Sequence, residues 1–217
     1  MSFVRVDNRF LLSGHPPAGS DEPANVGILE ADLDARDWHA LALSGVVDFH
    51  AMSHMTEGES SLTAGIDSAT GRVMTSNDGG VSWHQGATIA ARDLAIEPSI
   101  ISIVATTEDG PVISDDLGQT WQSIERAPLL VLVEAGFDTD SQRRVFGVDV
   151  HGALHVSPDG LEWQSLGVLP IQPDAFGVGE SGTIVIVNTQ SVMKSRDGGQ
   201  SWSQIADLSL PAVSVEG

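Results

Sequence analysis

The side chains in this chain that could do chemistry are mainly carboxylates and histidines. Its 217 residues include 30 acidic, 10 basic and 7 histidine residues, and they include neither cysteine nor tyrosine. The absence of cysteine excludes disulfides, thiol nucleophiles and cysteinyl metal sites. Paired carboxylates remain available, and two carboxyl groups about 5 to 9 Å apart are the minimum that glycoside hydrolysis needs.

Polar residues recur at equivalent places along the chain, just after or just before a short apolar run. The candidate ligand-binding residues chosen on this basis are His15, Asp48, His50, Asp67, Thr107, Asp149 and Asn188. The candidates for a catalytic carboxylate are Asp67, Asp149 and Glu108, and Arg92, Asp93 and Asp174 lie near the same places. Because Asp and Asn also cap hairpin turns, each single residue has a structural interpretation as well.

Metal and cofactor chemistry is weakly supported. Asp48, His50 and His54 lie close in sequence, and residues four apart on a strand share one face. They are nevertheless roughly 13 Å apart on an extended strand, which is too far to share one ion. The pair His151 and His155 fails for the same reason. The sequence therefore predicts no metal site and no cofactor.

Five tryptophans, at 38, 83, 121, 163 and 202, indicate the elements that must position these side chains. They recur about every forty residues, the spacing of a four-stranded propeller blade. In the third repeat the predicted strands are 93–97, 100–106, 111–114 and 120–124. The sequence thus predicts an all-β, single-domain propeller over residues 1–217, with four-stranded antiparallel blades at about 1–44, 45–89, 90–126, 127–168 and 169–210.

The last four tryptophans each close a phrase of the form S-x-D-x-G-x-[ST]-W, which is typical of a hairpin turn. The aspartate can accept backbone N–H bonds, the glycine supplies a positive φ, and the tryptophan begins the next strand. The third of these phrases, SPDGLEW at 157–163 in the fourth repeat, is one residue short. The predicted structural residues are Ser76, Asp78, Gly80, Trp83, Ser114, Asp116, Gly118, Trp121, Ser157, Asp159, Trp163, Ser195, Asp197, Gly199 and Trp202.

These phrases resemble the Asp-box, or BNR, repeats of sialidases, xyloglucanases, sortilin-type receptors and photosystem assembly factors. The chain is most similar to bacterial BNR-repeat proteins described as sialidase-like or glycosyl-hydrolase-like, through FLLSGHP, VDFHAM, VATTEDG and FGVDVHG. The resemblance implies a ligand site at the mouth opposite the boxes and a cell-envelope or secreted protein. It also implies a further blade before Met1, so that five visible blades form either a five-bladed ring or a six-bladed ring lacking its first blade. No signal peptide is recognisable after Met1.

The amino-acid composition argues against several classes of activity and partner. A sialidase needs a tyrosine nucleophile and an arginine triad, so the absence of tyrosine argues against that activity. A net charge of −20 argues against nucleic-acid and anionic-membrane partners. The favoured function is binding of a glycan or protein at the mouth, and the alternative is a glycoside hydrolase with paired mouth carboxylates. Exposed edges of an incomplete ring would favour oligomers, unless the tail at 211–215 adds a strand to the first blade.

Overall fold

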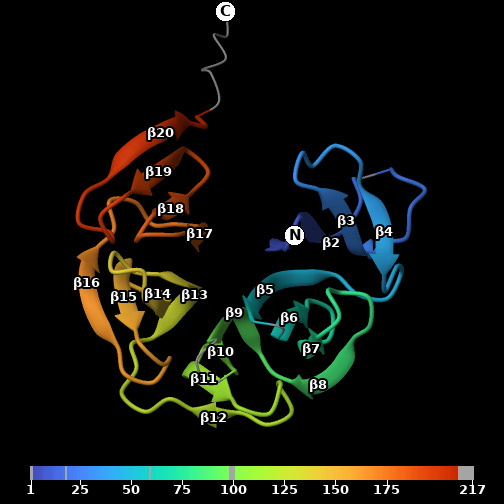
Figure 1. The fold of residues 1–217 in the computed structure, drawn as a ribbon, viewed down its shortest axis with the longest axis horizontal. Coiled ribbons are helices and arrows are strands. Elements are labelled where there is room, and N and C mark those ends of the chain that lie inside the picture. The colour runs from blue at the N-terminus through green and yellow to red at the C-terminus, as the bar shows by residue number, and fades with distance from the viewer. Residues whose placement is uncertain (1, 18, 59, 98–100, 210–217) are drawn as a thin grey trace, which may run out of the picture.

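The computed structural model describes residues 2–17, 19–58, 60–97 and 101–209. These residues form five four-stranded antiparallel sheets, each built from four consecutive strands, and they contain no helix. The sheets are arranged as the blades of a five-bladed β-propeller around a central axis (Figure 1). The predicted fold class is therefore confirmed.

Each blade runs from an inner strand at the axis to an outer strand at the rim. Blade 1 consists of β1 (Ser2–Val6), β2 (Arg9–Gly14), β3 (Gly27–Asp32) and β4 (His39–Ala42). Blade 2 consists of β5 (Phe49–Glu57), β6 (Ser60–Asp67), β7 (Arg72–Ser76) and β8 (His84–Thr88). Blade 3 consists of β9 (Ala91–Glu97), β10 (Ser102–Thr107), β11 (Gly110–Ser114) and β12 (Gln122–Ser123). Blade 4 consists of β13 (Leu130–Phe137), β14 (Arg143–Asp149), β15 (Ala153–Ser157) and β16 (Gln164–Val168). Blade 5 consists of β17 (Ala175–Val178), β18 (Ile184–Val187), β19 (Ser191–Ser195) and β20 (Ser203–Asp207).

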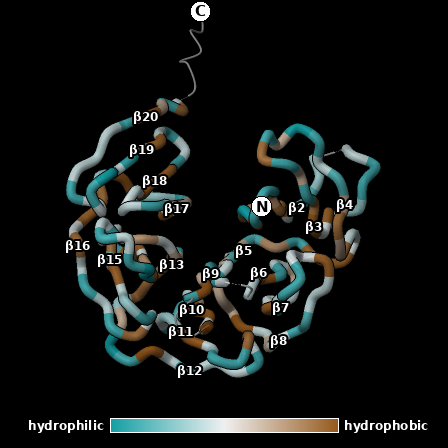
Figure 2. The backbone as a smooth tube through the Cα atoms, viewed as in Figure 1, coloured by the Kyte–Doolittle hydropathy of each residue, from teal (hydrophilic) through white to brown (hydrophobic). Residues whose placement is uncertain are grey.

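The hydrophobic core lies between successive blades. Buried β-branched and aliphatic side chains of each sheet pack against the next blade. The second strand of a blade is therefore buried on both faces, as in SIVATT of blade 3, where five of six residues are buried. Figure 2 shows these hydrophobic strands alternating with hydrophilic turns along the tube. Trp83, Trp121, Trp163 and Trp202 each pack against the interface with the preceding blade.

The hairpins that join the third and fourth strands of blades 2 to 5 are built around their aspartates. Asp116 accepts hydrogen bonds from the backbone N–H groups of Gln119 and Thr120 and from the Thr120 hydroxyl. Gly118, at φ +83°, donates its N–H to Ser114, and its carbonyl accepts from Nε1 of Trp121. We name the segments 76–83, 114–121, 157–163 and 195–202 the box turns. They all lie at one end of the propeller, which we name the box face, and the opposite end is the mouth.

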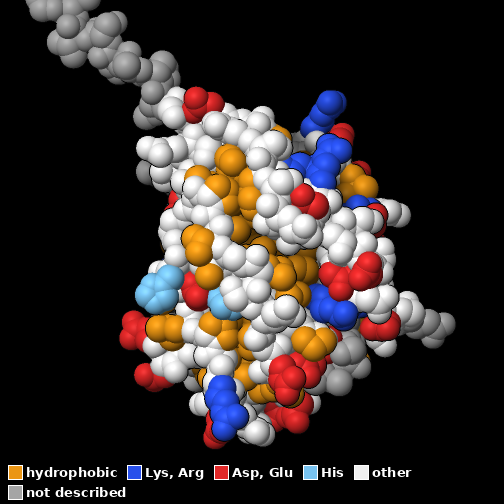
Figure 3. Space-filling view, turned by 90° about the vertical axis from the view of Figure 1, so that its left-hand side faces the viewer, with side chains coloured by type: hydrophobic (Ala, Val, Ile, Leu, Met, Phe, Trp, Pro, Cys, Tyr) orange, Lys and Arg blue, Asp and Glu red, His pale blue; other side chains and the backbone are white. Residues whose placement is uncertain are grey.

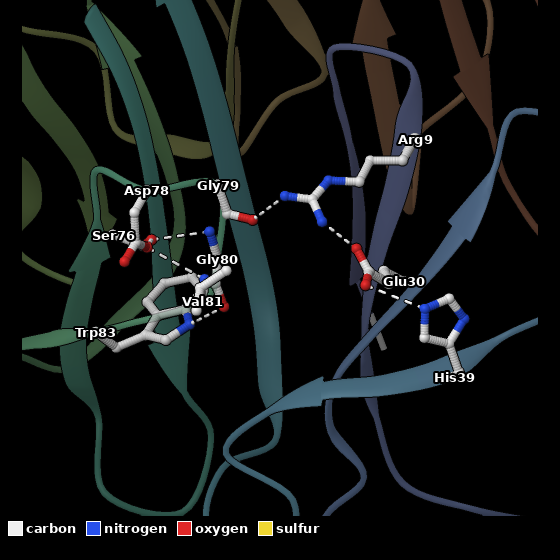
Figure 4. Close-up of polar contacts among 9 residues, drawn as sticks. All are labelled: Arg9, Glu30, His39, Ser76, Asp78, Gly79, Gly80, Val81 and Trp83. Atoms are coloured by element: carbon white, nitrogen blue, oxygen red, sulfur yellow. Dashed lines mark hydrogen bonds and ion pairs between the residues drawn. The ribbon is translucent and has the colours of Figure 1, made fainter.

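The box turn of blade 2 is also tied to blade 1 (Figure 4). The Arg9 guanidinium donates to the carbonyl oxygen of Gly79, 2.8 Å away, and forms an ion pair with Glu30. Glu30 in turn lies 3.1 Å from Nε2 of His39. Blade 1 has no box turn of its own, because Leu33 stands where the aspartate would be.

The box aspartates should make stability fall in acid. Hydrogen bonds from the side chain and backbone of Thr120 lower the pKa of Asp116 from 3.8 to about 2. A carboxylate whose pKa is lowered in the folded state stabilises that state fully above pH 4, and the contribution is lost as the pH falls towards 2. We expect Asp116→Asn to reduce the loss of Tm between pH 4 and pH 2. The control Asp115→Asn, at an exposed neighbour, should keep the wild-type slope, and equal slopes in all three proteins would contradict this role.

One side of the ring is open. The inner strands of consecutive blades contact one another in the order β1, β5, β9, β13 and β17. Blades 1 and 5 stand apart at the top of Figure 1, so each leaves one face uncovered.

Hydrophobic side chains also reach the surface over blades 4 and 5, where they form an interrupted band among polar groups (Figure 3). The predicted strand at 211–215 lies outside the described residues, and a blade before Met1 stays a prediction.

Candidate functional site

A cavity of about 520 Å³ lies at the axis of the propeller and is lined by the inner strands of all five blades. Its wall combines apolar side chains such as Phe3, Leu132 and Phe176 with ionisable ones. The ionisable residues are Arg5, His50, His54, Arg92, Asp93, Glu134 and Asp174. A concave space that joins apolar side chains with convergent polar groups is a common form of ligand site in proteins.

At the box-face end of the propeller axis, residues from two blades contact each other across the axis. Arg143, from the start of β14, donates a hydrogen bond of 3.1 Å to the carbonyl oxygen of Thr56, at the end of β5. Its guanidinium also lies 5.1 Å from the centre of the Phe137 ring. These residues line a smaller space of about 200 Å³ on the box-face side of the axial cavity. Because the contact between Arg143 and Thr56 joins blade 4 to blade 2 at this end, we expect a ligand to enter the axial cavity from the mouth.

Two carboxyl groups of the cavity wall are perturbed by their surroundings. Asp93 accepts hydrogen bonds of 3.0 Å from its neighbour Leu94 and from Val133 of the next blade. Burial nevertheless raises the pKa of Asp93 to about 6. Burial, together with the negative charge of Asp93, raises the pKa of Glu134 to about 8. At neutral pH Glu134 therefore carries a proton and can donate it, whereas Asp93 is mostly ionised.

The sequence pattern does not predict this pair. It places Asp93 near the start of a strand and gives Glu134 no role. The signal that could have found Glu134 is an acid inside an otherwise apolar strand, LVLVEAGF. Perturbed acids of this kind concentrate at functional sites, although structural networks also produce them.

The acids predicted after the second strands instead make hydrogen bonds close to their own turns. Asp67 accepts from the backbone N–H of Asp48 at 3.2 Å and from the Thr70 hydroxyl at 2.6 Å. Asp149 accepts from the N–H groups of His151 and Ala153 and lies 2.9 Å from Nε2 of His155. Burial alone would raise the pKa of Asp149, but these hydrogen bonds outweigh it and lower that pKa.

The corresponding residues of blades 3 and 5 make the same kind of contact. The Thr107 hydroxyl donates to the carbonyl oxygen of Gly110 at 2.6 Å. Asn188 accepts from the N–H groups of Gln190 and Ser191 at 2.9 Å. Glu108 is exposed and lines a second cavity at the mouth, of about 600 Å³, between blades 3 and 4. A ligand-binding role for these residues stays a prediction.

Three of the predicted residues come together at the mouth. Nε2 of His50 lies 3.1 Å from Oδ2 of Asp48, and the ring centroid of His50 lies 6.5 Å from that of His15. His54 lies deeper, bonded through its two ring nitrogens to the hydroxyls of Thr63 and Thr56, and burial lowers its pKa.

Within the described ranges, no group of three or more His, Asp or Glu side chains is placed to hold a metal ion. The same ranges hold no helix that could span a membrane.

Comparison with known proteins supports the fold. No family model matches the chain. No curated protein matches it either. A structure of a nidogen/laminin complex matches with TM-score 0.64 and 15% identity, covering 93% of this chain and 75% of that one. The GH74 xyloglucanase from Xanthomonas campestris matches with TM-score 0.59 and 16% identity, covering 94% of this chain but only 37% of the enzyme.

A third structure, YCF48 bound to D1 peptide, matches with TM-score 0.44 and 17% identity, covering 93% and 79% of the two chains. Identities this low carry information about architecture only, because one fold hosts many functions. The chain is therefore similar in fold to a chain of the nidogen/laminin complex and to the GH74 xyloglucanase.

Proposed function

We propose that this propeller is a binding module that takes a segment of a glycan or protein into its central cavity from the mouth. The observation that carries the proposal is the cavity itself, to which all five inner strands contribute lining residues. Its acids, histidines and arginines can hydrogen-bond a polar ligand, while Phe3 and Phe176 offer apolar contact. The resemblance of the box turns to BNR repeats also implies a ligand site at the mouth, and it favours a cell-envelope or secreted protein.

Methionine methyl groups allow a direct test, because Met52 lines the cavity whereas Met193 packs between blades 4 and 5. We expect a ligand selected from a glycan or peptide array to shift the methyl resonance of Met52 and to leave that of Met193 in place. Binding that shifts Met193 without Met52 would contradict the location, and an array without any bound ligand would contradict the function.

The alternative is a glycoside hydrolase, and it is favoured by the perturbed pair Asp93 and Glu134. A protonated carboxylic acid beside an ionised carboxylate is the pairing that this chemistry uses. Because the chain has no tyrosine, sialoside hydrolysis by the usual nucleophile is not expected.

A panel of aryl glycosides, including a sialoside, separates the two functions. If the chain is an enzyme, we expect Glu134→Gln to lower kcat by about 10²- to 10⁴-fold, the usual contribution of a general acid. Asp67→Ala, Asp149→Ala and Glu108→Gln test the acids predicted from the sequence. Absence of turnover across the panel would rule the enzyme out and leave the binding module, and turnover that survives Glu134→Gln would reject this pair.

We further propose that the uncovered faces of blades 1 and 5 associate weakly between molecules. Phe3 of β1 is 68% exposed and meets Phe10 edge-on, and Ile205 of β20 is 56% exposed. We expect the elution volume in size-exclusion chromatography to decrease as the protein concentration rises, and Phe3→Ser to reduce that dependence. A single elution volume over a hundredfold concentration range would contradict the association.

A further inference from the structure

Two histidines from different blades face each other at the mouth. His15 follows β2 of blade 1, and His50 is the second residue of β5, the inner strand of blade 2. Their ring centroids are 6.5 Å apart, with the ring planes at 62°. His15 is exposed, and the His50 side chain is 52% exposed, so both imidazoles can be reached from solvent.

Asp48 fixes the orientation of His50. Its side chain is only 10% exposed, its Oδ2 lies 3.1 Å from Nε2 of His50, and its own backbone N–H is held by Asp67. Because a carboxylate is an acceptor, the proton of a neutral His50 belongs on Nε2, which leaves a lone pair on Nδ1. Nδ1 of His50 has no hydrogen-bond partner within the described part of the chain. A carboxylate behind one ring nitrogen is the usual support of a histidine that ligates a metal through the other.

The Asp48 carboxylate also has one oxygen, the buried Oδ1, that is not hydrogen-bonded to any of the described residues. Asp67 lies beside Asp48, and its Oδ1 is already used by the backbone N–H of Asp48. A buried acceptor without a partner costs free energy, and a nearby cation would lower that cost.

We propose that His15 and His50 bind one divalent transition-metal ion at the mouth, with Asp48 as a positioning residue behind His50. Imidazole nitrogens suit Zn²⁺, Ni²⁺ and Cu²⁺, whereas Ca²⁺ and Mg²⁺ require oxygen ligands. With metal–nitrogen distances of 2.0–2.1 Å, two rings on one ion have centroids roughly 5 Å apart. A side-chain adjustment of His15, which lies outside the strands, closes the present separation of 6.5 Å.

The remaining coordination positions are filled by water and open towards the central cavity, since His50 is part of its wall. The ion is therefore exchangeable and can accept an oxygen ligand from a molecule in the cavity. This site is independent of the proposed binding function. His54 lies on the same strand as His50 but too far along it to share one ion, so the second ligand comes from another blade.

Isothermal titration of the untagged, chelator-treated protein with zinc chloride at pH 7.5 tests the site. We expect one ion per chain, and a loss of affinity of more than tenfold in His15→Ala and in His50→Ala. Asp48→Asn should weaken binding by about tenfold or more while keeping one ion per chain, as expected of a residue behind a ligand. His84→Ala, at an exposed histidine of β8, is the matched control and should bind zinc as the wild type does.

Histidine ¹⁵N spectra with and without zinc provide a second readout that does not depend on the variants folding. We expect Nδ1 of His50 and one nitrogen of His15 to shift, and the nitrogens of His84 to stay. Failure to bind zinc, binding that survives in the His15→Ala/His50→Ala double variant, or an equal loss in His84→Ala would overturn the proposal.

Discussion

Replacing Trp83 with alanine is expected to lower the free energy of unfolding by about 3 kcal/mol, the lower part of the range for a large aromatic side chain. The Trp83 ring lies 5.0 Å from that of Phe49 in the core between blades 1 and 2. Its Nε1 donates a 2.8 Å hydrogen bond to the carbonyl oxygen of Gly80 in the box turn. The substitution therefore removes both interface packing and the anchor of the turn, and urea unfolding measures the loss.

Trp38 provides a matched control in the same molecule. It occupies the corresponding place in blade 1, and its Nε1 also donates to a local carbonyl, that of Ala35. No preceding blade covers it, however, and it belongs to none of the core clusters found among the described residues. We expect Trp38→Ala to cost less than about 1 kcal/mol, as for an ordinary surface substitution. Equal costs for the two tryptophans would contradict an open side next to blade 1.

Replacing Glu134 with glutamine is expected to stabilise the protein at alkaline pH. The pKa of this carboxyl is raised from 4.5 to about 8 in the folded state, so the folded protein holds a proton that the unfolded chain releases. Stability must then decrease as the pH rises from about 4.5 to about 8, because ionisation is easier in the unfolded chain. Glutamine keeps the shape and cannot ionise, so we expect a gain of about 4 kcal/mol at pH 8.5 and a change below about 1 kcal/mol at pH 5.

Thermal unfolding at these two pH values measures the effect. Asp93, whose pKa is raised to about 6, contributes in the same direction over a lower window. Glu125→Gln, at an exposed turn between β12 and β13, is the control and should follow the wild type at both pH values. A Glu134→Gln variant that is no more stable than the wild type at pH 8.5 would show that this carboxyl is well solvated.

The blades could be predicted because their signals are local. Each box turn contains its own acceptor, glycine and aromatic anchor within eight residues or fewer, so the repeat is readable without knowing the fold. The strand predicted at 111–114 corresponds to β11 at Gly110–Ser114. The strand β13 extends to Phe137, and its extended hairpin with β14 brings Arg143 to Thr56 of blade 2. That extension depends on a contact between residues 87 apart, which no local pattern contains.

The candidate site was harder to predict because its residues meet only when the inner strands of all five blades are arranged around one axis. Residues such as Asp149 and Asn188 recur at equivalent places, and their side chains are short enough to reach the N–H groups of their own turns. Glu134 breaks that pattern, and its raised pKa arises from burial against a neighbouring blade. His15 and His50 are far apart in sequence, and only the contact between blades 1 and 2 places them together.

The most direct test of the central claim is to block the mouth and the box face separately, which a chain without cysteine permits through single introduced thiols. Ala175→Cys places a thiol at the wall of the cavity, and Asp115→Cys places one in the box turn of blade 3; both positions are exposed. Each variant is modified with a bulky maleimide and compared with its unmodified form on one glycan and peptide array. We predict that modification at residue 175 abolishes binding and that modification at residue 115 leaves it unchanged. Binding lost at 115 and kept at 175 would contradict a ligand site at the mouth.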